Sequence, residues 1–241
     1  MDLGLTGKHA LVTGSTGGIG FAIARGLAAE GASVVVTGRT RATVDGALKR
    51  LRETVPAAKL TGLVADCATA AGADMVFAAV PELDIVVNNL GIYGRKPAFE
   101  ITDEEWRHFF EVNVMSGIRF ARHYAPGMAR RGWGRVVFVS SESALNIPKE
   151  MIHYGMTKTA QLSIMRGMAM ELAGSGVTVN ALLPGPTHTE NTDRLRAERD
   201  RIPAGPQRLR SRRHRRRVLR PGLPGPGPDR KSTRLNSSHL G

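Results

Sequence analysis

Short apolar runs alternate with longer amphipathic segments through most of the chain. The runs are rich in β-branched residues and are bounded by glycine or polar residues, a pattern that predicts buried strands. In the longer segments the apolar residues recur every three or four positions, which predicts helices. The predicted strands are HALVT (9–13), SVVVTG (33–38), KLTGLVAD (59–66), DIVVNN (84–89), GRVVFVSS (134–141) and VTVNALLP (177–184). The predicted helices are 19–30, 42–55, 68–80, 102–130 and 152–173.

The alternation of strand and helix sets the fold class. It implies right-handed crossovers between parallel strands, with helices on both faces of the sheet. We therefore predict one α/β domain over residues 1–195, built as three layers around a doubly wound parallel sheet. Thr102 and Glu105 form a T-x-x-E capping box that starts the helix 102–130.

Composition points to a cytoplasmic protein. The single cysteine, Cys67, excludes an internal disulfide and fits a reducing compartment. No apolar run approaches the roughly 18 residues of a membrane span. The N-terminal MDLGLTGKHALV lacks the basic region and long apolar stretch of a secretion signal. We predict a cytoplasmic protein with no membrane partner. No metal is predicted, because no spacing of His, Asp and Glu is typical of a metal site.

The positive charge lies mostly in the last fifth of the chain. The net charge is +13, from 34 Lys and Arg against 21 Asp and Glu, and residues 190–241 alone contribute +10. This segment contains RLRSRRHRRR (208–217) and PGLPGPGP (221–228), with almost no apolar periodicity. Such a composition cannot offset the entropy of ordering the chain, so residues 196–241 are predicted to be a disordered basic tail.

The tail also resembles a sequencing artefact. Residues 229–239, DRKSTRLNSSH, match residue for residue the translation of a sequencing-library adapter, and the stretch before them resembles a GC-rich gene read in a shifted frame. We hypothesise that the authentic frame ends near residues 190–200, which resequencing of the source DNA would test. The alternative is a nucleic-acid-binding arm, since arginines neutralise phosphates. No aromatic residue interleaves with the arginines to stack on bases, so no nucleic-acid partner is predicted.

A glycine-rich turn, TGSTGGIG (13–20), joins the first predicted strand to the first helix. Glycines let the backbone turn tightly and approach a pyrophosphate, and the helix N-terminus offers N–H groups to the phosphates. The spacing G-x-x-x-G-x-G alone leaves a plain strand–helix turn as an alternative. The residues predicted here to contact a dinucleotide are Thr13, Gly14, Ser15, Thr16, Gly18, Ile19 and Gly20.

Further motifs follow in a fixed order: NNLG (88–91), Asn113, Ser141, the Y-x-x-x-K pattern of Tyr154 and Lys158, and PGPT (184–187). Together with TGSTGGIG they resemble the motifs of the short-chain dehydrogenases/reductases over residues 5–190. The resemblance implies a Rossmann fold with strand order 3-2-1-4-5-6, an oxidoreductase that uses a nicotinamide cofactor and, for an intact relative, a homodimer or homotetramer. Leu90 replaces the family's usual alanine and is expected to crowd the cofactor slightly. The family's seventh strand and substrate lid have no recognisable counterpart, so we hypothesise that the chain as written, if truncated, is unstable, aggregated or inactive, which its solubility and cooperative unfolding would test.

The resemblance assigns the catalytic roles. Tyr154 and Lys158 are four residues apart and so share one helical face, where the ammonium favours the phenolate and lowers the pKa of Tyr154. Ser141 would hydrogen-bond the substrate oxygen, with Ser140 as the alternative serine. Asn113 resembles the residue that holds a water in a proton relay to Lys158. The substrate implied is a small carbonyl compound or alcohol, such as a 3-oxoacyl thioester, a sugar or another small alcohol. A dinucleotide-binding protein without turnover is the alternative function.

The end of the second strand favours NADP(H) over NAD(H). No carboxylate stands there to bind a ribose 2′-hydroxyl, whereas Arg39 could face a 2′-phosphate with its guanidinium. An ordinary solvated arginine is the alternative. Asp66 resembles the family's adenine-contacting aspartate, with a turn-capping role as its alternative. The remaining residues predicted to hold the cofactor are Asn89, Gly91, Pro184, Gly185 and Thr187.

Overall fold

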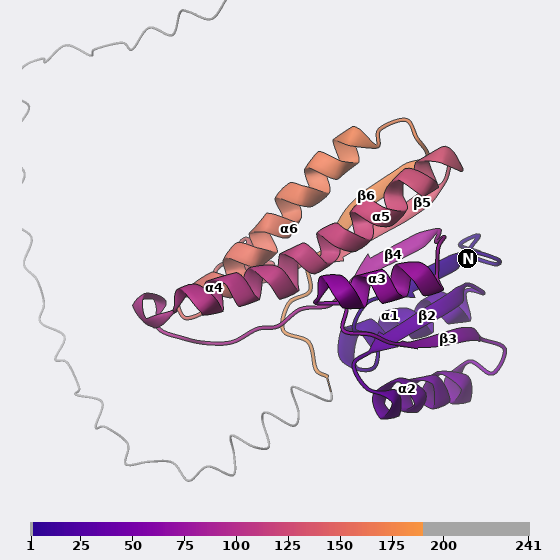
Figure 1. Ribbon diagram of the computed structural model, residues 1–241, viewed down its shortest axis with the longest axis horizontal. Coiled ribbons are helices and arrows are strands. Elements are labelled where there is room, and N and C mark those ends of the chain that lie inside the picture. Colours follow the sequence, from indigo (N-terminus) through magenta and orange to yellow (C-terminus); the bar gives the residue numbers. More distant parts are fainter. Residues whose placement is uncertain (1, 190–241) are drawn as a thin grey trace, which may run out of the picture. The chain divides into compact units, whose positions relative to one another are not determined.

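The computed structural model of the protein describes residues 2–189. The expectations for the basic tail and for a seventh strand lie outside these residues. The described strands form one parallel sheet in the order β3-β2-β1-β4-β5-β6 (Figure 1), which confirms the predicted fold class and order. The strands are β1 (His9–Val12), β2 (Ser33–Gly38), β3 (Lys59–Val64), β4 (Ile85–Asn88), β5 (Gly134–Val139) and β6 (Val177–Leu182).

Among residues 2–189, six α-helices, two 3₁₀ turns and one π-helical turn lie between the strands. The α-helices are α1 (Gly18–Ala29), α2 (Arg41–Thr54), α3 (Ala70–Ala79), α4 (Asp103–Phe110), α5 (Ser116–Arg130) and α6 (Ile152–Glu171). Short 3₁₀ turns, η1 (Ala98–Glu100) and η3 (Glu142–Ala144), lie in the loops. The predicted helix 102–130 is divided between α4 and α5 by a π-helical turn, η2 (Glu111–Met115), in which the Ser116 N–H reaches the Glu111 carbonyl five residues back. Apolar periodicity does not reveal such a one-residue widening.

Each face of the sheet has its own apolar core. Side chains alternate between the two faces along each strand. On one face Val12, Val34 and Val36 pack with buried residues of α1 and α2. On the other face Leu11 and Val86 pack with buried residues of α3 and α5 and with partly buried residues of α6. Burying each such side chain contributes about 1.5–3 kcal/mol, so the two cores hold the strands in their register.

The parallel strands bring their carboxyl ends to one edge of the sheet, where the loops after β1, β2, β3, β4, β5 and β6 meet. In an open α/β sheet this edge is the usual place for a ligand. All the residues proposed above for the site lie in these loops or at the helix ends beside them, apart from Asn113 in the π turn and the Tyr154–Lys158 pair in α6. Within residues 2–189 no helix is long and apolar enough to cross a bilayer.

Candidate active site

A cavity of about 710 Å³ opens at the carboxyl edge of the sheet. Its walls include residues from the glycine-rich turn, the loops after β2, β3 and β4, the end of β5, helix α6 and the loop after β6. The predicted site residues that line it are Gly14, Thr16, Gly18, Ile19, Gly20, Arg39, Asp66, Asn89, Gly91, Ser141, Tyr154, Lys158, Pro184, Gly185 and Thr187. The structure therefore brings together residues that are up to 173 positions apart, from Gly14 to Thr187.

Three predicted residues support the cavity wall from behind. The Thr13 hydroxyl accepts hydrogen bonds from the N–H groups of Asn89 and Leu90, each at 3.0 Å. The Ser15 hydroxyl donates to the Val12 carbonyl at 2.7 Å and accepts from the Thr37 N–H at 3.0 Å. These bonds join the loop after β1 to the end of β2 and to the loop after β4. The third of these supporting residues is Asn113, which is fully buried.

The glycine-rich turn has the shape that a phosphate group requires. Gly14 and Gly18 have φ angles of +63° and +55°, which glycine adopts readily. A Cβ atom on Gly20 would lie 2.4 Å from Asn89 Nδ2 and 2.5 Å from the Gly14 carbonyl oxygen. Helix α1 begins at Gly18 after Gly17, which has no side chain to cap its first N–H groups. The backbone can therefore approach a dinucleotide pyrophosphate closely, so these residues fit the cofactor.

Leu90 lies against the glycine-rich turn. Its Cδ1 atom is 3.2 Å from the position that a Cβ of Gly14 would take. The side chain lines the cavity and also packs on the core shared with α3 and α5. Crowding of a cofactor by Leu90 stays a prediction. The crowding is expected beside Gly14, because the Leu90 side chain lies there.

The three proposed catalytic side chains converge on the cavity. Tyr154 and Lys158 lie one turn apart on α6, with Lys158 Nζ 5.6 Å from the centre of the Tyr154 ring. Ser141, just after β5, lies close enough to the Tyr154 side chain to lower the pKa of its hydroxyl. The Ser140 hydroxyl instead donates to the Lys158 carbonyl at 2.8 Å. This geometry favours Ser141 as the serine that faces a substrate.

Burial sets the protonation of the pair. It lowers the pKa of Lys158 to about 8, because the ammonium is removed from water. The expectation that Lys158 lowers the pKa of Tyr154 is wrong for the protein without a bound cofactor, because burial raises the pKa of Tyr154 and Ser141 only opposes that rise. At neutral pH the pair is therefore a protonated phenol beside a lysine that is still mostly charged. A proton donor to a developing oxyanion requires this combination.

Asn113 holds the loop that follows β4. Its Oδ1 accepts from the Ile92 N–H at 2.7 Å, and its Nδ2 donates to the Ile92 carbonyl at 2.9 Å and to the Thr157 hydroxyl at 3.0 Å. A Cβ atom on Gly91 would lie 3.3 Å from Lys158 Nζ, so glycine there makes room for the ammonium. The water-holding role implied for Asn113 stays a prediction, because the structure shows its side chain bound to protein partners.

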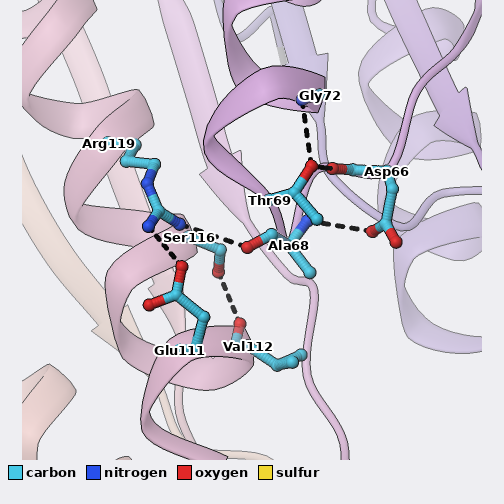
Figure 2. Close-up of polar contacts among 8 residues, drawn as sticks. All are labelled: Asp66, Ala68, Thr69, Gly72, Glu111, Val112, Ser116 and Arg119. Atoms are coloured by element: carbon cyan, nitrogen blue, oxygen red, sulfur yellow. Dashed lines mark hydrogen bonds and ion pairs between the residues drawn. The ribbon is translucent and has the colours of Figure 1, made fainter. Parts of the chain in front are cut away.

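An arginine that the sequence did not single out supports the loop after β3. Figure 2 shows Arg119 of α5 donating to the Ala68 carbonyl at 3.1 Å and pairing with Glu111 of the π turn. Ala68 lines the cavity beside Asp66, whose Oδ1 accepts from the Ala68 N–H at 3.1 Å. Asp66 thus caps its own turn and also faces the cavity. Arg119 and Glu111 hold this turn against the end of α5.

We expect Arg119→Met to weaken dinucleotide binding about 3- to 10-fold, because the Ala68 carbonyl loses its charged donor and the turn at Asp66 loosens. Maximal turnover should not change. Titration of the protein with nucleotide, followed by fluorescence, measures the effect. Arg107→Met is the control, since Arg107 pairs with Asp103 at the surface, where such a pair contributes little. Equal affinity in both variants would show that Arg119 does not support the site.

Sequence reasoning also passed over Gln161. It is almost fully buried, and its side chain lies behind Lys158. Its spacing in the sequence could have indicated it, because Gln161 follows Lys158 by three residues and so shares a helix face with it. Among residues 2–189 no three His, Cys, Asp or Glu side chains gather as a metal site would require.

Comparison with known proteins gives consistent matches. The family model described as short chain dehydrogenase matches residues 8–200. YvaG, an oxidoreductase of Bacillus subtilis (strain 168), is 47% identical over 195 residues, which cover 81% of this chain and 74% of that protein. Galactitol 2-dehydrogenase (L-tagatose-forming) of Cereibacter sphaeroides is 37% identical over 194 residues, covering 80% and 76%. The structure of L-sorbose reductase from Gluconobacter frateurii, complexed with NADPH and L-sorbose, matches with a TM-score of 0.79 and 32% identity, covering 85% of this chain and 79% of that one.

Proposed function

The chain belongs to the short-chain dehydrogenase/reductase family of oxidoreductases, and on this premise we propose that it transfers hydride between NADP(H) and a ketone or the corresponding secondary alcohol. The observation that carries the proposal is the convergence of Ser141, Tyr154 and Lys158 on the cavity that begins at the glycine-rich turn. We also propose that it works as a homodimer or homotetramer.

The residues of the chain would divide the work as follows. The nicotinamide, when bound, supplies the hydride. Tyr154 gives its phenolic proton to the carbonyl oxygen of the substrate as negative charge develops there. Ser141 hydrogen-bonds the same oxygen and lowers the energy of that charge. The Lys158 ammonium stabilises the phenolate that remains and binds the ribose hydroxyls beside the nicotinamide.

The preference for NADP(H) is part of the proposal. Arg39 lines the cavity at the end of β2, and among the described residues Asp66 is the only carboxylate that lines it. A guanidinium there suits a 2′-phosphate, and the relative that reduces L-sorbose was crystallised with NADPH.

Arg39→Asp should therefore reverse the cofactor preference. We expect the ratio of kcat/KM for NADPH to that for NADH to fall by about 100-fold, since an attraction is replaced by a repulsion. Steady-state rates with each nucleotide give this ratio. Arg52→Asp makes the same change of charge at an exposed position of α2 and should leave the ratio as it is. If both variants keep the native ratio, Arg39 does not read the phosphate.

The substrate class is open to a direct screen. Two of the relatives act on L-sorbose and galactitol, so sugars and polyols come first in the panel, followed by 3-oxoacyl thioesters and simple ketones. The resequenced, full-length protein is mixed with NADPH or NADH and a ketone, or with the oxidised nucleotide and an alcohol. A change in nicotinamide absorbance reports turnover. Nucleotide binding without turnover on any member of the panel would favour a dinucleotide-binding protein over an enzyme.

A further inference from the structure

A buried amide stands behind the lysine of the active site. Gln161 follows Lys158 by three residues on α6, so both side chains lie on the same face of the helix. Only 1% of Gln161 is exposed. Gln161 does not line the cavity, so it would not contact a substrate or nucleotide bound there. A long polar side chain in such a place is costly to bury unless both ends of its amide have partners.

Both ends of the amide have partners. The Nε2 group donates to the carbonyl of Asn113 in the π turn at 2.6 Å. The Oε1 atom lies 3.5 Å from Lys158 Nζ, which is a long hydrogen bond. A carbonyl can only accept and an ammonium can only donate, so these two partners fix which end of the amide faces which group. Gln161 therefore links the π turn to the ammonium in one orientation.

Lys158 needs this link because few other groups solvate its charge. Its Nζ donates to the Val139 carbonyl at 2.9 Å, and only 4% of the residue is exposed. The segments packed nearby contribute neutral groups: Gly91 after β4 lies beside the ammonium, and the Ser140 hydroxyl bonds only the backbone carbonyl of Lys158. The titratable neighbour is Tyr154, on the same helix. The Gln161 oxygen is thus one of two acceptors that hold the ammonium in place.

We propose that Gln161 is a positioning residue, whose amide fastens the Lys158 ammonium to the Asn113 carbonyl and so holds it at the distance from Tyr154 that proton transfer requires. This inference rests on the proposed function. The Asn113 carbonyl that Gln161 binds belongs to the π turn, so the amide joins that turn to α6. The linked residues come from two helices, so a shift of either one would move the ammonium.

Gln161→Met tests the proposal, because methionine has a similar volume and removes both polar contacts. The pH dependence of kcat for alcohol oxidation is the first measurement. Tyr154 must be deprotonated to accept a proton, and a poorly held ammonium favours the phenolate less. We expect the acidic limb of the profile to move upward by about half to one pH unit. Ser163→Ala, at an exposed position of α6, is the control and should keep the native profile.

The titration of Lys158 itself provides a measurement that does not need turnover. The pH dependence of its reaction with acetic anhydride, followed by mass spectrometry, reports its apparent pKa. We expect this value to fall in Gln161→Met, because an acceptor is lost, and to rise in Gln161→Glu, because a carboxylate then faces the ammonium. If Gln161→Met does not fold, the Lys158 titration in Gln161→Glu tests the proposal alone.

The outcomes separate the two proposals. Native protein that turns over, with variants that change neither the pH profile nor the Lys158 titration, would overturn the role of Gln161 and leave the proposed function standing. Native protein without turnover on any substrate would remove the proposed function and with it the positioning role, and opposite shifts of the Lys158 titration in the two variants would then show only that the Gln161 amide contacts the ammonium. A variant that only loses stability while both readouts stay native would reduce Gln161 to a packing residue.

Discussion

Replacing Tyr154 with phenylalanine is expected to lower kcat for ketone reduction by at least about 100-fold while nucleotide affinity changes little. The substitution removes one oxygen atom and the proton that it carries, and leaves the aromatic ring in the cavity wall. No other phenol lies beside both Ser141 and Lys158 among the described residues. Steady-state rates and a nucleotide titration on the same preparation measure the two quantities separately.

Tyr124→Phe is the matched control for this experiment. Tyr124 lies in α5, is buried, and donates its hydroxyl proton to the Val80 carbonyl at 2.7 Å. Its loss should reduce the free energy of unfolding by about 1 kcal/mol and leave kcat unchanged. If the two variants retain the same turnover, Tyr154 does not carry the proton, and the proposed mechanism is wrong.

Gly20→Ala should have the second large effect, on nucleotide binding. The added methyl group would stand within 2.5 Å of both Asn89 Nδ2 and the Gly14 carbonyl oxygen, and neither can easily move. Asn89 Nδ2 is held by the carbonyls of Thr13 and Gly14, at 2.9 and 3.2 Å. Overpacking there should cost about 1–3 kcal/mol and displace the turn that a pyrophosphate approaches. We expect nucleotide affinity to fall at least about 10-fold, as isothermal titration calorimetry would show.

The same helix supplies the control. Gly26 of α1 is exposed, and a Cβ added there would meet no atom within 4 Å. Gly26→Ala should therefore stabilise the protein by about 0.5–1 kcal/mol, because alanine favours a helix over the unfolded chain, and should not affect the nucleotide. Normal affinity in Gly20→Ala would mean that the turn tolerates a side chain and that its glycines do not serve a phosphate.

Much of the fold could be predicted because one physical signal dominates it. The described strands are short and apolar, and β2 and β4 are almost entirely buried, so each stands out as an apolar run. The edge strands of the described sheet, β3 and β6, keep exposed positions. The run SVVVTG matches β2 at both ends. The other strands end one or two residues before their predicted limits, where the chain turns into the loops of the site. Thr102 and Glu105 form the predicted capping box and start α4.

The supporting residues that local sequence patterns did not predict form contacts with residues far away in the sequence. Arg119 bonds to Ala68, 51 positions away, and Gln161 bonds to Asn113, 48 positions away. Neither residue belongs to a motif. Each one supports the site only after packing of the strands and helices has brought its distant partner close. Many of the residues that line the cavity could be proposed in advance, since they follow strand ends or belong to spaced motifs, whereas others, such as Tyr93 and His108, could not. Their supporting partners required the three-dimensional arrangement, and the roles proposed for all of them await the variants described above.

The π turn between α4 and α5 also limits how the length of this chain can vary. The π turn contains one residue more than the α-helical turn that would span the same length. Deleting one residue from Glu111–Met115 would therefore convert it to regular α-helix. That conversion would rotate α4 by about 100° around the axis of α5. Phe109, whose ring lies 4.1 Å from that of His153, would then turn away from α6. A deletion should be tolerated far better at the η1 turn, Ala98–Glu100, which has no buried residue and does not line the cavity.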